Sequence, residues 1–402
     1  MHNARKITEE LFYIGCSDRH LALFESAYPV PNGISYNSYL LKDEKTVLFD
    51  TVDKSCAEQF YENLEFALGD RKLDYLVVHH MEPDHAALIA EVLRRYSDVK
   101  IVCTAKAQVM IKQFFEFDID NCSIIVKEGE TLNTGSHELT FYMAPMVHWP
   151  EVMVTYDKTD KILFTADAFG SFGAINGNLF DDEIDWKCEC LDEARRYYTN
   201  IVGKYGLQVQ MLLKKAAGLD IRMICPLHGQ VIRENIGLLV EKYNKWSTYT
   251  PEENSVLIAY SSVYGGTENT VEILAAKLAD KGVKNIKMFD LSYNHYSYVL
   301  AEAFRYSHIV LATTTYNAGI FESMENFLNI LVAHNLQNRK FALIENGSWA
   351  AVCGGQMRTK LESLKNTEFL NNVFSIKSTL KNEQLAELDN VVIAIEKSLN
   401  LG

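Results

Sequence analysis

A dense group of imidazole and carboxylate side chains lies near residue 80. Four such residues fall within six positions, directly after the apolar run 73–78: His80, Glu82, Asp84 and His85. Placing this many polar groups beside an apolar strand is costly unless they bind something. Loops at the carboxyl ends of strands are also where α/β folds usually carry their chemistry. We therefore expect a metal site here.

Three further donors each close an apolar segment farther along the chain: His148, Asp167 and His228. Each alone has an ordinary explanation as a polar strand end or a helix cap. Together with the first group they supply seven nitrogen and oxygen donors. Such a set suits two metal ions if one carboxylate bridges them and a solvent ligand takes the remaining space.

The second half of the chain carries a different kind of motif. The apolar run 256–260 is followed by hydroxyl and glycine residues at 261–268, and then by a helical pattern. A turn of this composition directs backbone N–H groups and the positive end of a helix dipole at an anion, here a phosphate. The turn lacks the lysine of a Walker loop and is not a G-x-G-x-x-G dinucleotide motif.

Two more loops, 313–319 and 346–350, also follow apolar runs. Each combines an aromatic side chain with small or polar residues, which suits the rings and polar edge of an isoalloxazine. We predict FMN as the ligand of these three loops. The residues predicted to bind it are Ser262, Val263, Tyr264, Gly265, Gly266, Thr267, Thr314, Thr315, Tyr316, Asn317, Gly319, Gly347, Ser348 and Trp349.

The elements that position these motifs divide the chain in two. In the first half several apolar runs follow one another without a helix, which predicts mixed sheets with hairpins; the main runs are 38–41, 46–52, 75–80, 100–105, 138–145 and 161–167. After the polar, proline-containing segment 247–255, strands alternate with helices, as in a doubly wound parallel sheet. We predict domains at 1–248 and 254–402, and an α/β fold throughout.

The order and spacing of the seven donors resemble the metal motif of the flavodiiron proteins, also called A-type flavoproteins. The flanking segments 37–41 and 148–150 agree with that family, and the three loops of the second half resemble those of short-chain flavodoxins in the family's order. The resemblance covers nearly the whole chain. It implies an N-terminal metallo-β-lactamase-like αββα sandwich followed by a flavodoxin-like domain.

The resemblance also implies roles for the donors. His80, Glu82 and His148 would bind one iron, Asp84, His85 and His228 the other, and Asp167 would bridge them together with a hydroxide or oxo group. Hydrolytic relatives of this fold carry a second histidine where this chain has Glu82. A carboxylate there favours iron over zinc. Two ferrous ions, about +4, would be balanced by three carboxylates and a hydroxide, about −4.

Composition excludes several other classes of protein. The chain has 402 residues, 48% of them apolar, and a net charge of −14, which disfavours nucleic acid and anionic membranes as partners. No stretch approaches the roughly 20 apolar residues of a membrane span, and we expect a cytoplasmic protein. The eight cysteines form no C-x-x-C pair and are expected to be reduced core thiols.

We therefore predict a flavodiiron oxidoreductase that reduces O2 to water or NO to N2O. Without a C-x-x-C pair, no fused rubredoxin module is expected, so the electron donor would be separate: rubredoxin, another small redox protein or a reduced deazaflavin. The resemblance implies a head-to-tail homodimer or a tetramer. One alternative is a zinc hydrolase of the metallo-β-lactamase superfamily with an accessory flavodoxin domain, and another is a flavin and metal storage or sensor protein.

Overall fold

The chain folds into two compact units, Met1–Asn244 and Lys245–Gly402. The computed structural model describes residues 1–400, so the last two residues of the predicted domain 254–402 lie outside it. Helix α8 (Ile236–Ser247) and strand β17 (Glu253–Tyr260) leave only 248–252 between them as a connection. Within residues 1–400, no helix is long and apolar enough to cross a membrane.

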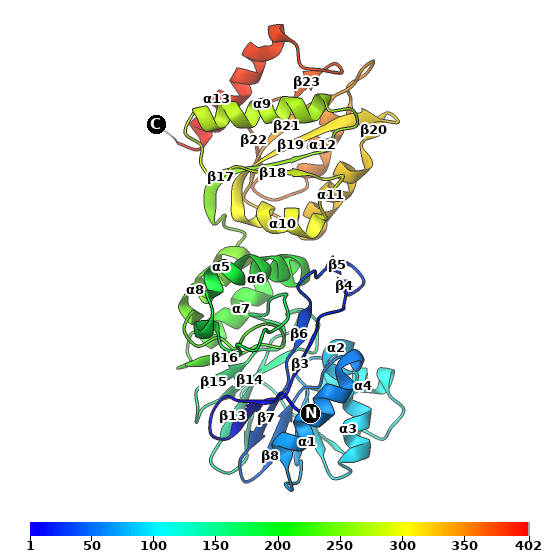
Figure 1. The fold of residues 1–402 in the computed structure, drawn as a ribbon, viewed down its shortest axis with the longest axis vertical. Helices are drawn as coiled ribbons and strands as arrows, with labels where there is room; N and C mark the ends of the chain where they lie inside the picture. The colour runs from blue at the N-terminus through cyan, green and yellow to red at the C-terminus, as the bar shows by residue number, and fades with distance from the viewer. Residues whose placement is uncertain (401–402) are drawn as a thin grey trace. The chain divides into compact units, whose positions relative to one another are not determined.

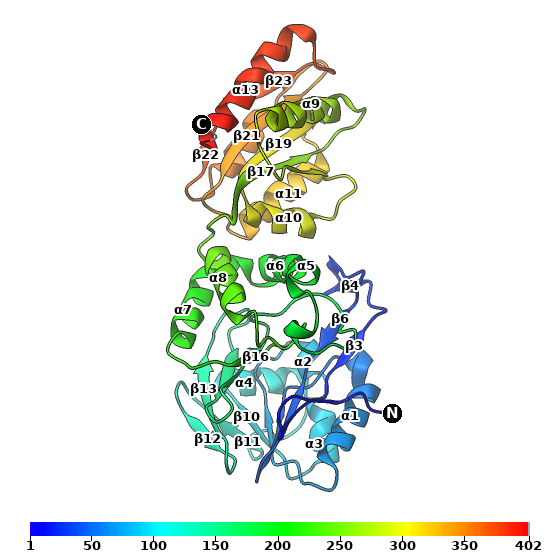
Figure 2. The same cartoon turned by 60° about the vertical axis from the view of Figure 1, so that its left-hand side comes forward.

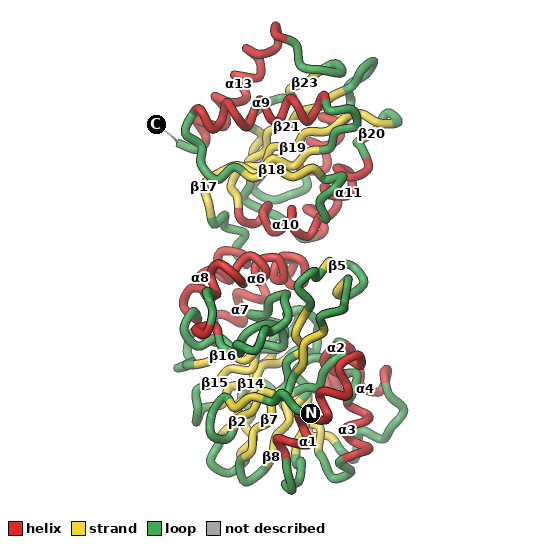
Figure 3. The backbone as a smooth tube through the Cα atoms, in the orientation of Figure 1, coloured by secondary structure: helices red, strands yellow, loops and turns green. Residues whose placement is uncertain are grey.

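The N-terminal unit contains two mixed sheets packed face to face (Figure 3). The first sheet has the order β1 (Arg5–Lys6), β2 (Leu11–Tyr13), β7 (Tyr39–Lys42), β8 (Thr46–Phe49), β9 (Tyr75–Val77), β10 (Lys100–Cys103), β11 (Ser123–Ile125). The second has the order β12 (Thr131–Asn133), β13 (Glu138–Met143), β14 (Met153–Asp157), β15 (Ile162–Phe164), β16 (Met223–Cys225). Two hairpins complete the strands of this unit: β3 (Cys16–Asp18) with β6 (Ile34–Tyr36), and β4 (Leu23–Phe24) with β5 (Tyr28–Pro29).

Helices cover the outer faces of both sheets (Figure 1). Beside the first sheet lie η1 (Lys54–Cys56), α1 (Ala57–Leu68), α2 (Pro83–Ala86), α3 (Ile89–Arg95) and α4 (Ala105–Phe114). Beside the second lie α5 (Trp186–Glu189), α6 (Leu191–Tyr197), α7 (Gly206–Ala216) and α8, with the short turns η2 (Asp181–Glu183), η3 (Tyr198–Val202) and η4 (Gly203–Tyr205). The predicted αββα sandwich is confirmed.

The core of this unit lies between the two sheets. Phe49 of β8 stacks on Phe164 of β15, with ring centroids 4.0 Å apart. Strands β8, β9 and β10 are mostly apolar and buried, apart from Thr46 and the exposed Lys100 at their starts, because the sandwich covers one face and helices the other. The predicted metal ligands follow the carboxyl ends of β9 in the first sheet and of β13, β15 and β16 in the second.

The C-terminal unit is a parallel sheet in the order β18 (Lys287–Asp290), β17, β19 (Tyr306–Tyr316), β21 (Lys340–Asn346), β22 (Glu368–Phe369), with β23 (Phe374–Ile376) also beside β21 and β20 (Gly319–Ile320) antiparallel to β19. This order reverses at β17, as in flavodoxin-like sheets. Helices α9 (Gly266–Asp280) and α13 (Leu385–Ser398) lie on one face of the sheet, and α10 (Tyr296–Arg305) and α11 (Glu322–Ala333) lie on the other (Figure 2). Helix α12 (Cys353–Leu361) and the turn η5 (Asn382–Gln384) complete the unit. The predicted flavodoxin-like fold is confirmed.

Candidate diiron centre and flavin site

The structure brings all seven predicted metal ligands of the N-terminal unit together. They form two groups whose donor atoms lie within 4.8 Å of one another: His80, Glu82, His148 and Asp167 in one, and Asp84, His85 and His228 in the other. Five of the seven are buried, and Glu82 and His148 are partly buried. Residues from four separate loops therefore converge on one pocket at the carboxyl ends of the strands.

Asp167 joins the two groups. Its Oδ2 atom lies 3.1 Å from Nε2 of His80 and 3.2 Å from Nε2 of His148. Its Oδ1 atom lies 3.3 Å from Nε2 of His85 and 3.6 Å from Nε2 of His228. One carboxylate oxygen thus faces each group, which is the arrangement that a carboxylate bridge between two metal ions requires.

The terminal carboxylates complete the two groups. Oε2 of Glu82 lies 2.9 Å from Nε2 of His148 and 3.2 Å from Nε2 of His80. In the other group, Oδ2 of Asp84 lies 3.2 Å from Nε2 of His85 and 3.3 Å from Nε2 of His228. Each group therefore holds two imidazole nitrogens, its own carboxylate and one oxygen of Asp167.

The hydrogen-bonding state of these atoms fits metal ligation. Within residues 1–400, the carboxylate oxygens of Asp84 and Asp167 are buried and receive no well-directed hydrogen bond. Buried carboxylates without donors are costly unless cations balance them. The Nε2 atoms of His85 and His228 lie only 3.0 Å apart. Imidazole and carboxylate donors in these numbers suit a pair of iron ions.

Residues outside the predicted set orient two of the histidines. Nδ1 of His80 lies 2.8 Å from Oε1 of the buried Glu151, which also accepts a hydrogen bond from the backbone N–H of Met81 at 2.9 Å. Nδ1 of His228 lies 2.7 Å from the carbonyl oxygen of Ser35. An acceptor at Nδ1 keeps the proton there, so Nε2 presents its lone pair to a metal. Neither Glu151 nor Ser35 was predicted from the sequence.

The neighbouring His79 has a different role. Its Nδ1 atom lies 2.5 Å from Oδ2 of Asp50, and its Nε2 atom lies 2.7 Å from Oγ1 of Thr155 in the second sheet. Both ring nitrogens are therefore engaged within the sandwich. His79 ties the two sheets together, while His80 faces the metal ligands.

Two short helices follow strand β9. Asp84 and His85 lie in the first, α2, and the second, α3, begins only at Ile89. The carbonyl oxygen of His85 accepts hydrogen bonds from the backbone N–H of Thr51 at 2.9 Å and from its hydroxyl at 2.7 Å. In a continuous helix this carbonyl would bond the N–H of residue 89. Thr51 takes its place and fixes α2.

Aromatic rings surround the second group of ligands. The ring centroids of Phe24, Tyr36 and Tyr197 lie 5.4, 5.8 and 5.3 Å from that of His228. Burial raises the pKa of Tyr197 well above its ordinary value, and the charges of Asp167 and Asp84 act in the same direction. The pocket therefore has a low dielectric, in which fixed charges act strongly.

Without metal, the carboxylates of the site hold protons on its histidines. Burial lowers the pKa of a histidine, but the charge of Asp84 raises the pKa of His85 to about 10. The neighbouring carboxylates of Asp167 and Glu82 likewise outweigh burial and raise the pKa of His148 to about 9. Protons thus occupy the positions in which metal cations would balance the same carboxylates.

We predict that the affinity of the metal-free protein for a divalent ion rises with pH. A metal ion must displace the protons on His85 and His148, so the affinity should increase about tenfold per pH unit for each proton released, between pH 6 and about 9. Above about pH 10 it should level off. Titration with Zn²⁺ against a chromophoric chelator at several pH values measures this. An affinity independent of pH over that range would contradict it.

The predicted flavin residues lie on loops at the carboxyl edge of the C-terminal sheet. The Ser262 hydroxyl accepts hydrogen bonds from the backbone N–H groups of Gly265 at 3.1 Å and Glu268 at 3.3 Å, which closes the turn before α9. Gly265 has a φ of 85°, a left-handed conformation that favours glycine. At Gly266 an added Cβ would lie 2.0 Å from the carbonyl oxygen of Ser378. The loop therefore requires its glycines.

Asn346 links the loops to one another. Its side-chain amide donates to the hydroxyl of Thr267 at 3.2 Å and to the carbonyl oxygen of Ser378 at 3.1 Å, and its Oδ1 accepts from the N–H of Ser378 at 2.9 Å. The hydroxyl of Thr315 accepts from the N–H of Val352 at 3.0 Å. The three predicted loops are thus adjacent. A fourth segment, at Ser378, is bonded to Asn346 and was not predicted from the sequence.

Several aromatic side chains of these loops are exposed. Tyr264 is 99% exposed, Trp349 92% and Tyr316 46%. Val263, directly before Tyr264, is also exposed, at 40%. Large apolar side chains left in solvent beside a phosphate-type turn are available to contact a planar ligand. Cys353, by contrast, is fully buried, with its thiol 3.7 Å from the carbonyl oxygen of Thr313.

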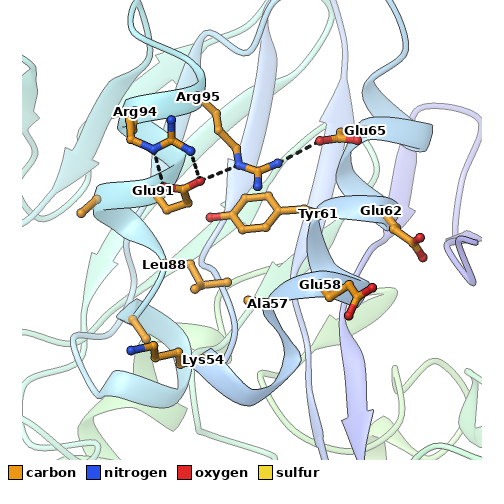
Figure 4. Close-up of a pocket in the computed structure, with 12 residues that line it drawn as sticks. Lys54, Ala57, Glu58, Tyr61, Glu62, Glu65, Leu88, Glu91, Arg94 and Arg95 are labelled. Carbon is orange, nitrogen blue, oxygen red and sulfur yellow. Dashed lines mark hydrogen bonds and ion pairs between the residues drawn. The ribbon is translucent and has the colours of Figure 1, made fainter.

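A separate hollow of about 790 Å³ lies between α1 and α3 (Figure 4). Four of its charged side chains pair with one another: Glu91 accepts hydrogen bonds from Arg94 and Arg95, and Arg95 also donates to Glu65 at 2.9 Å. The Arg95 guanidinium lies 3.8 Å from the ring centroid of Tyr61. These contacts join two helices, and none of the predicted metal or flavin residues lines the hollow.

Comparisons with known proteins agree with this architecture. A family model described as ODP family beta lactamase matches residues 34–229. The chain is 31% identical over 323 residues to an uncharacterized protein of Methanocaldococcus jannaschii, covering 80% of each chain. It is 29% identical over 361 residues to the anaerobic nitric oxide reductase flavorubredoxin of Escherichia coli, covering 89% of this chain and 74% of the relative.

Solved structures match over almost the whole length. Rubredoxin oxygen:oxidoreductase from Desulfovibrio gigas superposes with a TM-score of 0.92 at 28% identity, covering 99% of this chain and 98% of the other. The flavodiiron protein from Giardia intestinalis has the same fold, with a TM-score of 0.93 at 23% identity and coverage of 99% and 97%. With the two groups of donors in place, the similarities to the flavorubredoxin and to rubredoxin oxygen:oxidoreductase show that the chain belongs to the flavodiiron protein family.

Proposed function

We propose that this flavodiiron oxidoreductase passes electrons from an external donor through FMN to two irons, where O2 is reduced to water or NO to N2O. The observation that carries the proposal is Asp167, whose two oxygens face two separate groups of ligands. The relatives named for nitric oxide and for oxygen support both substrates. In this proposal residues 1–248 hold the iron and residues 254–402 hold the flavin.

For the metal site we assign His80, Glu82 and His148 to one iron, and Asp84, His85 and His228 to the other, with Asp167 bridging together with a hydroxide or oxo group. Bound there, an iron pair can deliver electrons to a small diatomic molecule. The chain's own contribution is to hold the ligands in place. Glu151 and the Ser35 carbonyl orient the imidazoles, and the surrounding aromatic rings exclude water.

For the flavin we assign the turn Ser262–Thr267 to the phosphate and the other two loops to the ring system. Bound there, FMN accepts electrons from the donor and passes them on. Backbone N–H groups at the start of the fifteen-residue helix α9 would bind the phosphate, with the helix dipole favouring its charge. The exposed rings of Tyr316 and Trp349 would contact the flavin.

The hydrolase alternative is not favoured. A zinc hydrolase needs no flavin unit, whereas the second unit of this chain, described as far as residue 400, has a flavodoxin-like sheet. Glu82 also stands beside His80 and His148 as a hard carboxylate ligand. The electron donor is a rubredoxin-like protein or a reduced deazaflavin in our proposal, and the assembly a head-to-tail homodimer or a tetramer. Cytoplasmic location stays a prediction.

We expect the purified protein to be yellow and to contain about one FMN and two irons per chain, since both sets of binding residues are complete. Metal analysis and release of the flavin on denaturation measure this. Anaerobic reduction followed by addition of O2 or NO then tests turnover. Zinc in place of iron, with no flavin and no gas consumption, would reject the proposal in favour of the hydrolase.

We predict that flavin and iron are separable by mutation. Ser262→Leu and Thr267→Leu should release FMN, because a hydroxyl at the start of α9 is lost at each position, while the two irons stay bound. Ser292→Leu, at an exposed turn of the same unit, is the matched control and should keep both. Flavin absorbance and iron content decide the outcome. Loss of iron along with flavin from a folded variant would contradict the division between units.

A further inference from the structure

Two buried cysteines from distant parts of the N-terminal sequence lie together. Cys16 begins β3, and Cys56 ends η1 immediately before α1. Strand β3 lies against η1, and the Ser55 hydroxyl donates a hydrogen bond to the carboxylate of Asp18 at 3.2 Å. Both cysteines line the same cavity, beside Asp18 and Ser55. This pairing could not be seen in the sequence, where the cysteines are 40 positions apart.

Small molecules can approach this pair. A cavity of about 750 Å³ is lined by both cysteines together with Asp18, His20, Ser55 and Gln59. Cys56 is 9% exposed and Cys16 3%. Cys56 therefore forms the more accessible end of the pair, and Cys16 lies behind it.

The two thiols differ chemically. The neighbouring Cys16 thiol lowers the pKa of Cys56, against the opposing effect of burial. Cys56 also occupies the N-cap position of the twelve-residue helix α1, where the helix dipole favours a thiolate. Burial raises the pKa of Cys16, so that this thiol stays protonated. One member of the pair is suited to attack and the other to donate a proton.

We propose that Cys16 and Cys56 form an oxidisable dithiol that reacts with hydrogen peroxide to give an intramolecular disulfide. The Cys56 sulfur attacks one peroxide oxygen, which breaks the O–O bond and forms a sulfenic acid. The Cys16 sulfur then attacks the Cys56 sulfur, the S–S bond forms, the S–O bond breaks and water leaves. In total two thiols lose two electrons and two protons, and one peroxide becomes two waters.

The dithiol adjoins the proposed metal site. Cys16 is paired with Tyr36 across β3 and β6, and the ring of Tyr36 lies 6.4 Å from that of His85 and 5.8 Å from that of His228. The next residue back along β6, Ser35, holds Nδ1 of His228. A covalent link at Cys16 would therefore tie β3, which pairs with the strand that carries Ser35 and Tyr36, to the start of α1. The dithiol itself does not depend on the metal assignment.

Peptide mapping of the holoprotein tests the proposal. After peroxide treatment, blocking with iodoacetamide and digestion with trypsin, we expect a disulfide between peptides 7–19 and 55–71, each of which contains one cysteine. The thiol count should fall from eight to six per chain and return with dithiothreitol. No link between these peptides, at a peroxide concentration that oxidises Cys188, would overturn the proposal.

Variants identify the role of each cysteine. Cys16→Ser should stop at a sulfenic acid on Cys56, which dimedone traps, and Cys56→Ser should form no link. Cys188→Ser is the matched control, because Cys188 is exposed and its hydrogen bond with Asp185 raises the pKa of its thiol. That variant should form the link as fast as wild type. Trapping on Cys16 instead of Cys56, or a link that persists in Cys56→Ser protein, would refute the assignment.

Discussion

Asp167→Asn is expected to damage the metal site more than any other single substitution of a ligand. Both oxygens of Asp167 are used, one toward each group, whereas Glu82 contacts only the first group. Asparagine keeps the shape but removes the negative charge, and its amide nitrogen is a poor ligand. Two cations would then repel each other in a low-dielectric pocket with one shared anion fewer. We expect the loss of about one iron or more per chain and of nearly all turnover.

Glu82→Gln is the matched comparison, since it removes one charge from a terminal ligand of the same site. We expect it to retain more iron than Asp167→Asn and to weaken the first group only. In both variants the donor should still reduce FMN, because the flavin loops lie in the other unit. Iron content, anaerobic flavin reduction and gas uptake are measured on each. A fully metallated Asp167→Asn protein with turnover near wild type would remove Asp167 from the bridging position.

The metal ligands could be predicted from the sequence because they are recognised by residue type and by their position directly after apolar strands. His80, Glu82 and Asp84 follow an apolar strand too closely for an ordinary turn, and His148 and Asp167 end strand-like runs. Sheet topology then brings strand ends together whatever the details of the loops. The same logic located the turn at Ser262–Thr267, where glycine and hydroxyl residues precede a helix.

The supporting residues could not be predicted in this way. Glu151 looks like any polar residue after a turn, and only the packing of the two sheets places its carboxylate beside His80. Ser378 lies 32 positions after Asn346 in a segment without a motif, yet its backbone is bonded to that side chain. The break between α2 and α3 likewise depends on Thr51, which comes from another strand end. These contacts join residues that are far apart in the sequence, so they cannot be predicted from local sequence patterns.

Glu151→Leu is expected to produce the second-largest effect on the metal site, although Glu151 is not itself one of the proposed ligands. Its Oε1 atom accepts hydrogen bonds from the N–H of Met81 and lies 2.8 Å from Nδ1 of His80, and the side chain is fully buried. Leucine would leave the Met81 N–H without a partner and free the His80 ring to rotate or change tautomer. Loss of such an orienting partner typically weakens metal binding about 10- to 100-fold.

A graded series separates the contributions of the hydrogen bond and the charge. Glu151→Gln keeps an acceptor for both donors but loses the charge, so it should weaken iron binding less than Glu151→Leu does. Glu138→Gln, at a partly exposed position paired with Lys158, removes a charge far from any ligand contact and should leave iron binding unchanged. Iron retained during competition with a chelator ranks the three variants. Because His80 belongs to the first group of ligands, we expect the iron bound by that group to be lost first. Equal iron retention in wild type and Glu151→Leu would show that packing alone orients the His80 imidazole.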